Sequence, residues 1–151
     1  MIDTTHLTPA MLKEKILKLY GEGVPGSQML IVIQSFGFKN GLPLDSDLVL
    51  DVRFLPNPFY DPELKHLTGN DTPVQEFLEK TSQTYEFLQM ECKMLDFLIP
   101  KYELEGKSQL VISVGCTGGQ HRSVYIANKL HEHLRLKSYR VEILHRELQE
   151  N

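Results

Sequence analysis

The chain lacks the features that mark secreted, membrane-spanning and strongly basic proteins. It has two cysteines among 151 residues, a pattern that fits reduced thiols in the cytoplasm rather than a disulfide framework. No run of 18 apolar residues and no signal-peptide pattern occurs, so we expect neither a membrane span nor secretion. Sixteen Lys and Arg stand against 20 Asp and Glu, a net charge of −4, which argues against tight binding of nucleic acid over the bulk surface.

Internal repeats and low-complexity segments are also absent. A length of 151 residues suits one domain, residues 1–151, and a domain of this size buries roughly 68–70% of the surface of its unfolded chain. Residues 1–7 are polar and are expected to be the remnant of an interdomain linker. Thr8 and Pro9 then predict the start of a helix.

The apolar runs predict an α/β fold with a small, mostly parallel sheet flanked by helices. Strands are expected at residues 29–33, 48–50, 110–114 and 139–144. Between the last two, Val124 to Leu134 show helical spacing, and this strand-helix-strand unit predicts parallel strands joined by a right-handed crossover.

Residues 55–102 are expected to form an irregular segment followed by helices. The irregular part, residues 55–70, contains three prolines. Thr72 and Gln75 match a capping box, which predicts a helix start. Apolar residues from 85 to 102 predict a long amphipathic helix that Pro100 kinks or ends.

The most informative segment is residues 116–123, Cys-Thr-Gly-Gly-Gln-His-Arg-Ser, here called the glycine loop. It lies between a predicted strand and a predicted helix, where unpartnered N–H groups and the helix dipole favour an anion. Gly118 and Gly119 allow positive φ and close approach of a ligand, and Arg122 offers a guanidinium that grips two oxygens. The loop therefore predicts a phosphate site, with a plain turn and a solvated Arg122 as the alternative.

Polar side chains follow all four predicted strands. Because ligands of α/β sheets bind beyond the carboxyl ends of the strands, we expect these groups to form one site at that edge. The groups are Ser35 and Lys39, Asp51 and Arg53, residues 116–122, and His145 with Arg146.

Cys116, Gly119, Arg122 and Ser123 also match the C-x-x-G-x-x-R-S loop of cysteine-dependent phosphatases. A thiolate in such a loop is a nucleophile. Gly115 stands where these phosphatases usually have histidine, and only Asp51 or Asp61 could serve as general acid. We therefore expect no enzyme activity, with Cys116 filling the strand end, and keep a phosphatase as the alternative.

Two other groups of side chains have open roles. His121 is expected to donate to a phosphate or to cap the loop, and Arg53 to contact the ligand or to brace Asp51. His131 and His133 are two residues apart on a predicted helix and make a poor metal pair. No metal site and no cofactor are expected.

Long strings of this sequence resemble the C-terminal domain of the RapZ/YvcJ family. They are residues 35–39, Asp-Val-Arg-Phe-Leu-Pro-Asn-Pro at 51–58, residues 67–69, residues 115–125 and His145-Arg146. The resemblance implies a bacterial cytoplasmic protein whose relatives carry an N-terminal P-loop domain. In the best-known branch, the C-terminal domain senses glucosamine-6-phosphate, binds small regulatory RNAs and presents them to an endoribonuclease.

On this basis we expect a regulatory domain that binds a phosphorylated amino sugar, implied to be glucosamine-6-phosphate. The phosphate would be held by the glycine loop, and weaker candidates would contact the sugar. The ligand-binding set is Cys116, Thr117, Gly118, Gly119, His121, Arg122 and Ser123, with Arg53, Asn57 and His145. The resemblance further suggests a homo-oligomer, formed through the first helix or the apolar face of residues 85–102.

Three features depart from the family pattern. No G-x-x-x-x-G-K-[ST] motif occurs, so nucleotide binding is not carried over. Phe59 follows Asn-Pro where the RNA-binding branch has histidine, and the chain ends in residues 147–151, Glu-Leu-Gln-Glu-Asn, instead of a basic tail. We therefore expect only weak binding of small RNA. A regulatory protein partner is a further expectation from the resemblance.

Overall fold

The computed structural model describes residues 29–148. Its strands are β1 (Leu30–Gly37), β2 (Leu48–Asp51), β3 (Gln109–Cys116) and β4 (Arg140–His145), and its helices are α2 (Thr72–Glu79), α3 (Ser82–Leu104) and α4 (Arg122–Leu136). Short 3-10 helices span Phe38–Asn40, Pro58–Tyr60 and Arg146–Leu148. The expected linker at residues 1–7 and the helix after Thr8 lie outside the described residues.

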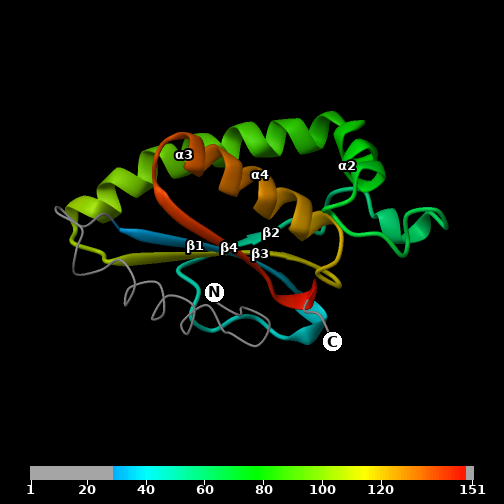
Figure 1. The fold of residues 1–151 in the computed structure, drawn as a ribbon, viewed down its shortest axis with the longest axis horizontal. Coiled ribbons are helices and arrows are strands. Elements are labelled where there is room, and N and C mark those ends of the chain that lie inside the picture. The colour runs from blue at the N-terminus through cyan, green and yellow to red at the C-terminus, as the bar shows by residue number, and fades with distance from the viewer. Residues whose placement is uncertain (1–28, 149–151) are drawn as a thin grey trace.

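The four strands form one all-parallel sheet in the order β2-β3-β1-β4. The expected α/β fold is confirmed. Helices α2, α3 and α4 lie over the same face of this sheet (Figure 1). Strands β3 and β4 are parallel as predicted, but β1 lies between them, with Ile33 paired to Ile112 on one side and to Ile143 on the other. All the strands therefore end at one edge, which also carries the start of α4.

Apolar side chains are buried on both faces of the sheet. Ile31 and Ile33 point into the larger core beneath the helices, and Leu30 and Val32 belong to a second buried cluster with Val111 and Leu144. Successive side chains of a strand face opposite ways, so continuous apolar runs such as residues 29–33 fit strands that are covered on both faces.

Two details of the helices differ from the sequence prediction. The expected capping box at Thr72 is wrong: Asp71 is the N-cap of α2, and its carboxylate accepts from the Thr68 backbone N–H at 2.8 Å. Of the two effects expected of Pro100, a kink or an end, the end is wrong, because α3 continues to Leu104. Pro100 is on the exposed side of the helix, where water can satisfy the freed carbonyl, while buried Ile99 keeps the last turns on the core.

The segment between β2 and α2 is largely irregular, as predicted, with the 3-10 turn Pro58–Tyr60 as its regular part. It runs past the carboxyl edge of the sheet before α2 begins. No helix of the described residues is long and apolar enough to cross a membrane.

Candidate functional site at the carboxyl edge of the sheet

The glycine loop connects β3 to α4, and α4 begins at Arg122 as expected. Gly119 has a φ of +78°, the left-handed region that favours glycine. Within residues 29–148, no hydrogen bond engages the backbone N–H groups of residues 117–122. The loop therefore presents a series of unpartnered donors at the positive end of the α4 dipole, the arrangement that binds anions.

Arg122 is buried beneath this loop, being 4% exposed. One guanidinium nitrogen, NH1, donates to the carbonyl oxygens of Arg53 at 2.7 Å and Leu55 at 3.0 Å. Its Nε is buried without a hydrogen-bond partner. The alternative of a solvated Arg122 is wrong, because the guanidinium lies inside the site with donor capacity that the described residues do not use.

The side chains beside Arg122 fasten the irregular segment over the loop. Gln120 Nε2 donates to the carbonyls of Lys65 at 2.9 Å and Leu67 at 2.7 Å. His121 Nε2 donates to the Leu64 carbonyl at 3.1 Å, and burial lowers the pKa of this imidazole. Residues 120–122 thus form a clamp that fixes one wall of the site.

A cavity of about 280 Å³ opens between the glycine loop and the irregular segment. The residues that line it combine cationic, amide and aromatic side chains: Lys39, Asn57, Phe59, Tyr60, Cys116, Thr117, Gly118, Gln120, His121 and Arg122. Asn57 caps the Pro58–Tyr60 turn by accepting from the Phe59 N–H at 3.0 Å. Of the expected ligand-binding set, five loop residues and Asn57 line this cavity, whereas Gly119 and Ser123 do not. The five are Cys116, Thr117, Gly118, His121 and Arg122.

Cys116 is 2% exposed at the end of β3 and lines the cavity. Its Sγ lies 3.2 Å from Ser123 Oγ and 3.4 Å from Ser123 N, so the thiol faces the first turn of α4. The neighbouring Gly115 has a packing reason: a Cβ there would lie 2.4 Å from the Phe36 ring and 2.6 Å from the Phe38 ring. A histidine could not replace Gly115 without moving those rings.

Arg53 lies outside the cavity lining. Its side chain donates to Asp51 at 3.0 Å through Nε and 2.7 Å through NH2, and its guanidinium carbon stands 4.0 Å from the centre of the Phe38 ring. The hydrogen bond from Arg53 holds the pKa of Asp51 below its usual value. The brace between these two residues is formed, and the Arg53 backbone carbonyl supports Arg122.

His145 also lies apart from the cavity, in a hydrogen-bonded series of side chains. Its Nε2 donates to Asn128 Oδ1 at 2.9 Å, and its Nδ1 accepts from the Ser35 hydroxyl at 2.7 Å. Asn128 in turn donates to Asn70 Oδ1 at 2.7 Å. Burial, with a smaller effect of His131, lowers the pKa of His145 to about 4, so this imidazole is neutral and joins β1, β4, α4 and the irregular segment.

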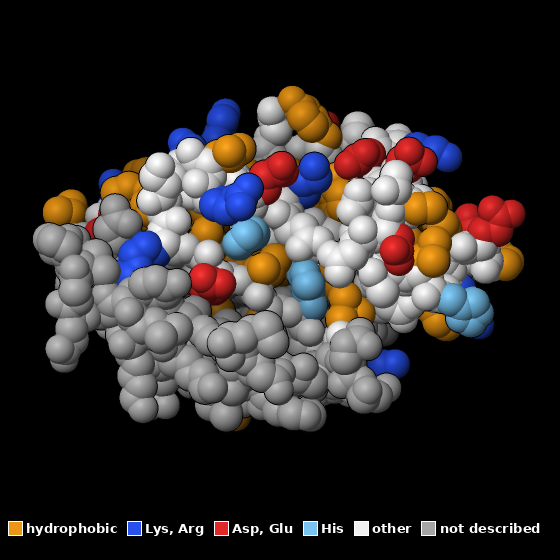
Figure 2. Space-filling view, in the orientation of Figure 1, with side chains coloured by type: hydrophobic (Ala, Val, Ile, Leu, Met, Phe, Trp, Pro, Cys, Tyr) orange, Lys and Arg blue, Asp and Glu red, His pale blue; other side chains and the backbone are white. Residues whose placement is uncertain are grey.

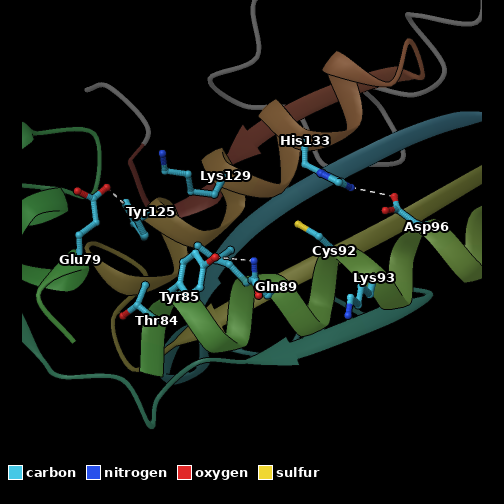
Figure 3. Close-up of a pocket in the computed structure, with 11 residues that line it drawn as sticks. Glu79, Thr84, Tyr85, Gln89, Cys92, Lys93, Asp96, Tyr125, Lys129 and His133 are labelled. Atoms are coloured by element: carbon cyan, nitrogen blue, oxygen red, sulfur yellow. Dashed lines mark hydrogen bonds and ion pairs between the residues drawn. The ribbon is translucent and has the colours of Figure 1, made fainter. Parts of the chain in front are cut away.

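A larger groove of about 590 Å³ lies elsewhere, between α3 and α4 (Figure 3). Leu88 and Cys92 contribute apolar lining, and burial raises the pKa of the Cys92 thiol to about 11. Figure 3 shows the pairs across the groove: Tyr125 donates to Glu79 at 2.8 Å, and His133 meets Asp96 at 2.8 Å. The buried hydroxyl of Thr84 in this lining has no partner among the described residues. The two pairs satisfy each other's charges, however, so the groove is less suited to a phosphate than the smaller cavity.

Sequence reasoning missed part of the cavity lining. Lys39 was recognised only as a strand-end residue, yet it meets the loop where its backbone N–H donates to the Thr117 carbonyl at 3.2 Å. Gln120 belongs to the glycine loop and Phe59 marks a departure from the family pattern, but neither is predicted to bind the ligand, and Tyr60 carries no signal in the sequence. Within residues 29–148, no cluster of three or more His, Cys, Asp or Glu side chains could hold a metal ion.

Comparison with known proteins assigns the chain to a family. The sequence profile of the RapZ C-terminal domain matches residues 29–149. A protein named nucleotide-binding protein from Limosilactobacillus reuteri (strain DSM 20016) is 54% identical over 149 residues, which cover 99% of this chain and 51% of the relative. A protein of the same name from Clostridium beijerinckii is 52% identical over 152 residues, covering 100% and 52%. The chain spans about half the length of the curated relatives it matches.

Proposed function

Because this chain belongs to the RapZ C-terminal domain family, we propose that it is a regulatory domain that binds a phosphorylated amino sugar, glucosamine-6-phosphate, in the cavity at the carboxyl edge of the sheet. The observation that carries the proposal is the glycine loop itself: backbone N–H groups without partners in the described chain, beside a buried Arg122 whose Nε is also unpartnered. Groups of this kind are satisfied by an anion.

The opposite wall of the cavity suits the sugar. Phe59 and Tyr60 offer ring surface, and Asn57 offers an amide. A volume of about 280 Å³ lies just below the roughly 300–1,000 Å³ range of pockets for drug-sized ligands, which favours a small ligand such as a monosaccharide. Lys39 adds a positive charge near Gly118 that favours the phosphate group.

Binding without turnover fits the described lining, because none of the described residues in it is a carboxylate. Asp51 is occupied by Arg53, and Asp61 accepts from the backbone N–H of Glu63 at 2.9 Å. His121 is fixed on the Leu64 carbonyl and its pKa is lowered. A phosphatase needs a group that protonates the leaving oxygen, and the described lining offers no carboxylic acid for that role.

A thermal-shift screen over sugar phosphates tests the proposal. We expect glucosamine-6-phosphate to raise the melting temperature, with a stabilisation of about 2.7 kcal/mol at a hundredfold excess over its dissociation constant. Glucosamine without phosphate should not change the melting temperature. Comparison with glucose-6-phosphate measures how much the amino group contributes to binding. Absence of stabilisation by every phosphorylated sugar would contradict the proposal.

A cysteine-dependent phosphatase is the second candidate, favoured by the contact between Cys116 Sγ and Ser123 in the cavity. Incubation with an aryl phosphate separates the two functions. We expect no turnover. Turnover that disappears in Cys116→Ser would replace the binding proposal, whereas turnover that survives the substitution would come from a contaminant.

Self-association belongs to the same proposal, with a correction to its surface. The apolar face of residues 85–102 packs into the core through Leu95 and Ile99, so it cannot supply the interface as a whole. The side of α3 that faces solvent instead exposes Met90, Met94 and Phe97. Exposed apolar surface of this extent favours an interface. Light scattering coupled to size-exclusion chromatography should give a mass above that of a 17.4 kDa monomer, and the double substitution of Met94 and Phe97 by Ser should lower it.

A further inference from the structure

The two charged residues that follow β4 bind the backbone at the end of β1. Glu147 Oε2 accepts from the Gly37 backbone N–H at 3.0 Å and from Arg146 Nε at 2.9 Å. Arg146 NH2 also donates to the Gly41 carbonyl at 2.7 Å. The side chains of Arg146 and Glu147, here called the C-terminal latch, therefore tie the last described 3-10 helix to both sides of Phe38–Asn40.

The latch also packs against the glycine loop. A Cβ on Gly119 would lie 2.4 Å from Glu147 Cγ and 2.6 Å from the Gly37 nitrogen. A Cβ on Gly37 would lie 2.5 Å from the carbonyl carbon of Gly118. Neither latch residue lines the cavity, so the latch contacts the loop without entering the proposed ligand site.

Resting on the proposed function, we propose that Arg146 and Glu147 are positioning residues that hold the glycine loop in its anion-binding conformation. The unpartnered N–H donors of the loop form no hydrogen bonds within the loop that would stabilise its conformation. Contacts with surrounding residues must therefore hold that conformation. When the latch holds the loop in this conformation before the anion binds, binding does not carry the entropic cost of ordering the loop, and the affinity for the anion is higher. The C-terminal end of the domain then sets the affinity of the phosphate site.

The coupling runs in both directions. If the latch strengthens anion binding, the bound anion stabilises the latch by the same free energy. A partner that bound residues 146–148 and pulled Glu147 from Gly37 would weaken anion binding. Conversely, the bound ligand would weaken binding of that partner, so that binding of the sugar phosphate would control binding of the partner.

The sign of a charge-removing substitution separates positioning from simple electrostatics. Replacing Glu147 removes a negative charge near an anion site, and through Coulomb attraction alone this should tighten phosphate binding. Loss of positioning should weaken it. Glu147→Gln and Glu147→Ala have the same charge, but glutamine keeps an oxygen that accepts from the Gly37 N–H, so the difference between them isolates the hydrogen bond.

Calorimetric titration with inorganic phosphate provides the affinity measurement. We expect Glu147→Ala to weaken binding by about tenfold, the size of one hydrogen bond of roughly 1–1.5 kcal/mol, and Glu147→Gln to lie between alanine and wild type. Glu142→Gln, an exposed position on β4, is the matched control for charge and should bind slightly more tightly than wild type. Affinity in Glu147→Ala that equals or exceeds that of this control would overturn the proposal.

Amide hydrogen exchange gives a second measurement that needs no ligand. In Glu147→Ala the Gly37 amide should exchange faster, together with the Lys39 amide that donates to the Thr117 carbonyl of the loop, while the β3 interior stays protected. If wild type binds neither phosphate nor a sugar phosphate, the proposed function fails and the exchange comparison alone decides on positioning. Unchanged exchange at Gly37 and Lys39 would overturn the latch, whether or not phosphate binds.

Discussion

The two cavities of this domain differ in size and in how their polar groups are satisfied. The groove between α3 and α4 is about twice as large as the cavity at the glycine loop, 590 Å³ against 280 Å³. In the groove, Tyr125 is paired with Glu79 and His133 with Asp96. At the loop, the N–H groups of residues 117–122 and the Nε of Arg122 are without partners within the described chain. Within residues 29–148, the groove holds one buried hydroxyl without a partner, that of Thr84, whereas the loop combines a series of backbone donors with a guanidinium. This combination, more than volume, identifies the ligand site.

Arg122→Ala should have the largest effect, because it acts on the ligand and on the fold. We expect phosphate affinity to fall by at least about a hundredfold, since charge-assisted hydrogen bonds are the strong ones. The free energy of unfolding should fall by about 3 kcal/mol, because the carbonyls of Arg53 and Leu55 lose their donor. Calorimetry and urea unfolding measure the two effects. Arg135→Ala, exposed near the end of α4, is the control and should change neither by much.

Acidification should destabilise the fold through His145. Its pKa is 6.5 in the unfolded chain and about 4 in the folded one, so below pH 6.5 the unfolded state binds more protons. Stability is then full above pH 6.5 and falls as the pH drops towards 4, by up to about 3 kcal/mol at 1.36 kcal/mol per unit. Urea unfolding at a series of pH values measures this slope. His145→Asn should flatten it, and an equally steep slope in that variant would assign the effect to other groups.

Gly69→Ala should break the clamp between the irregular segment and α4. A Cβ there would lie 2.4 Å from the His121 carbonyl oxygen and 2.6 Å from the Tyr125 nitrogen, both backbone atoms. We expect a loss of about 2 kcal/mol in thermal or urea unfolding. Gly118→Ala is the matched comparison, because its Cβ would only approach the Lys39 side chain at 4.0 Å; equal losses at the two positions would refute the clamp.

Tyr125→Phe removes the hydroxyl that pairs with Glu79 across the groove. The expected cost is about 1 kcal/mol of folding free energy, and phosphate affinity should stay within twofold of wild type. Urea unfolding measures the folding free energy, and calorimetric titration measures the phosphate affinity. A loss of phosphate affinity comparable to that of Arg122→Ala would move the binding site to the groove.

The smallest expected effect concerns RNA. Several basic side chains that could form a patch are paired: Lys129 with Glu132, Lys137 with Asp96, and Arg146 with Glu147. On the face seen in Figure 2, Lys and Arg side chains lie interspersed with Asp and Glu over the helices. Anisotropy titrations at two salt concentrations should give weak binding with a shallow slope, and submicromolar affinity at physiological salt would contradict this.

The sequence predicted the local features of this fold and missed those that depend on distant contacts. Apolar runs located the strands, and the glycine loop located the cavity, because each of these signals lies within a few neighbouring residues. The position of β1 between β3 and β4 has no local signal. Nor does the pairing of His145 with Ser35 and Asn128, which joins residues 110 and 17 positions apart.

The capping error at Thr72 has a different origin. Asp71 and Thr72 are both good N-cap residues, and only the bond from the Thr68 backbone N–H to the Asp71 carboxylate shows how the chain enters α2. Lys39 was likewise visible as a strand-end residue, but its place in the cavity depends on β1 and β3 being neighbours.

A heteronuclear NMR titration of the isotope-labelled chain with glucosamine-6-phosphate tests the central claim most directly. We expect saturable shifts of the backbone amides of residues 117–122, with smaller shifts at Asn57 and Phe59 and none at Leu88 or Cys92. Shifts confined to the groove between α3 and α4, or no shifts at millimolar ligand, would contradict it.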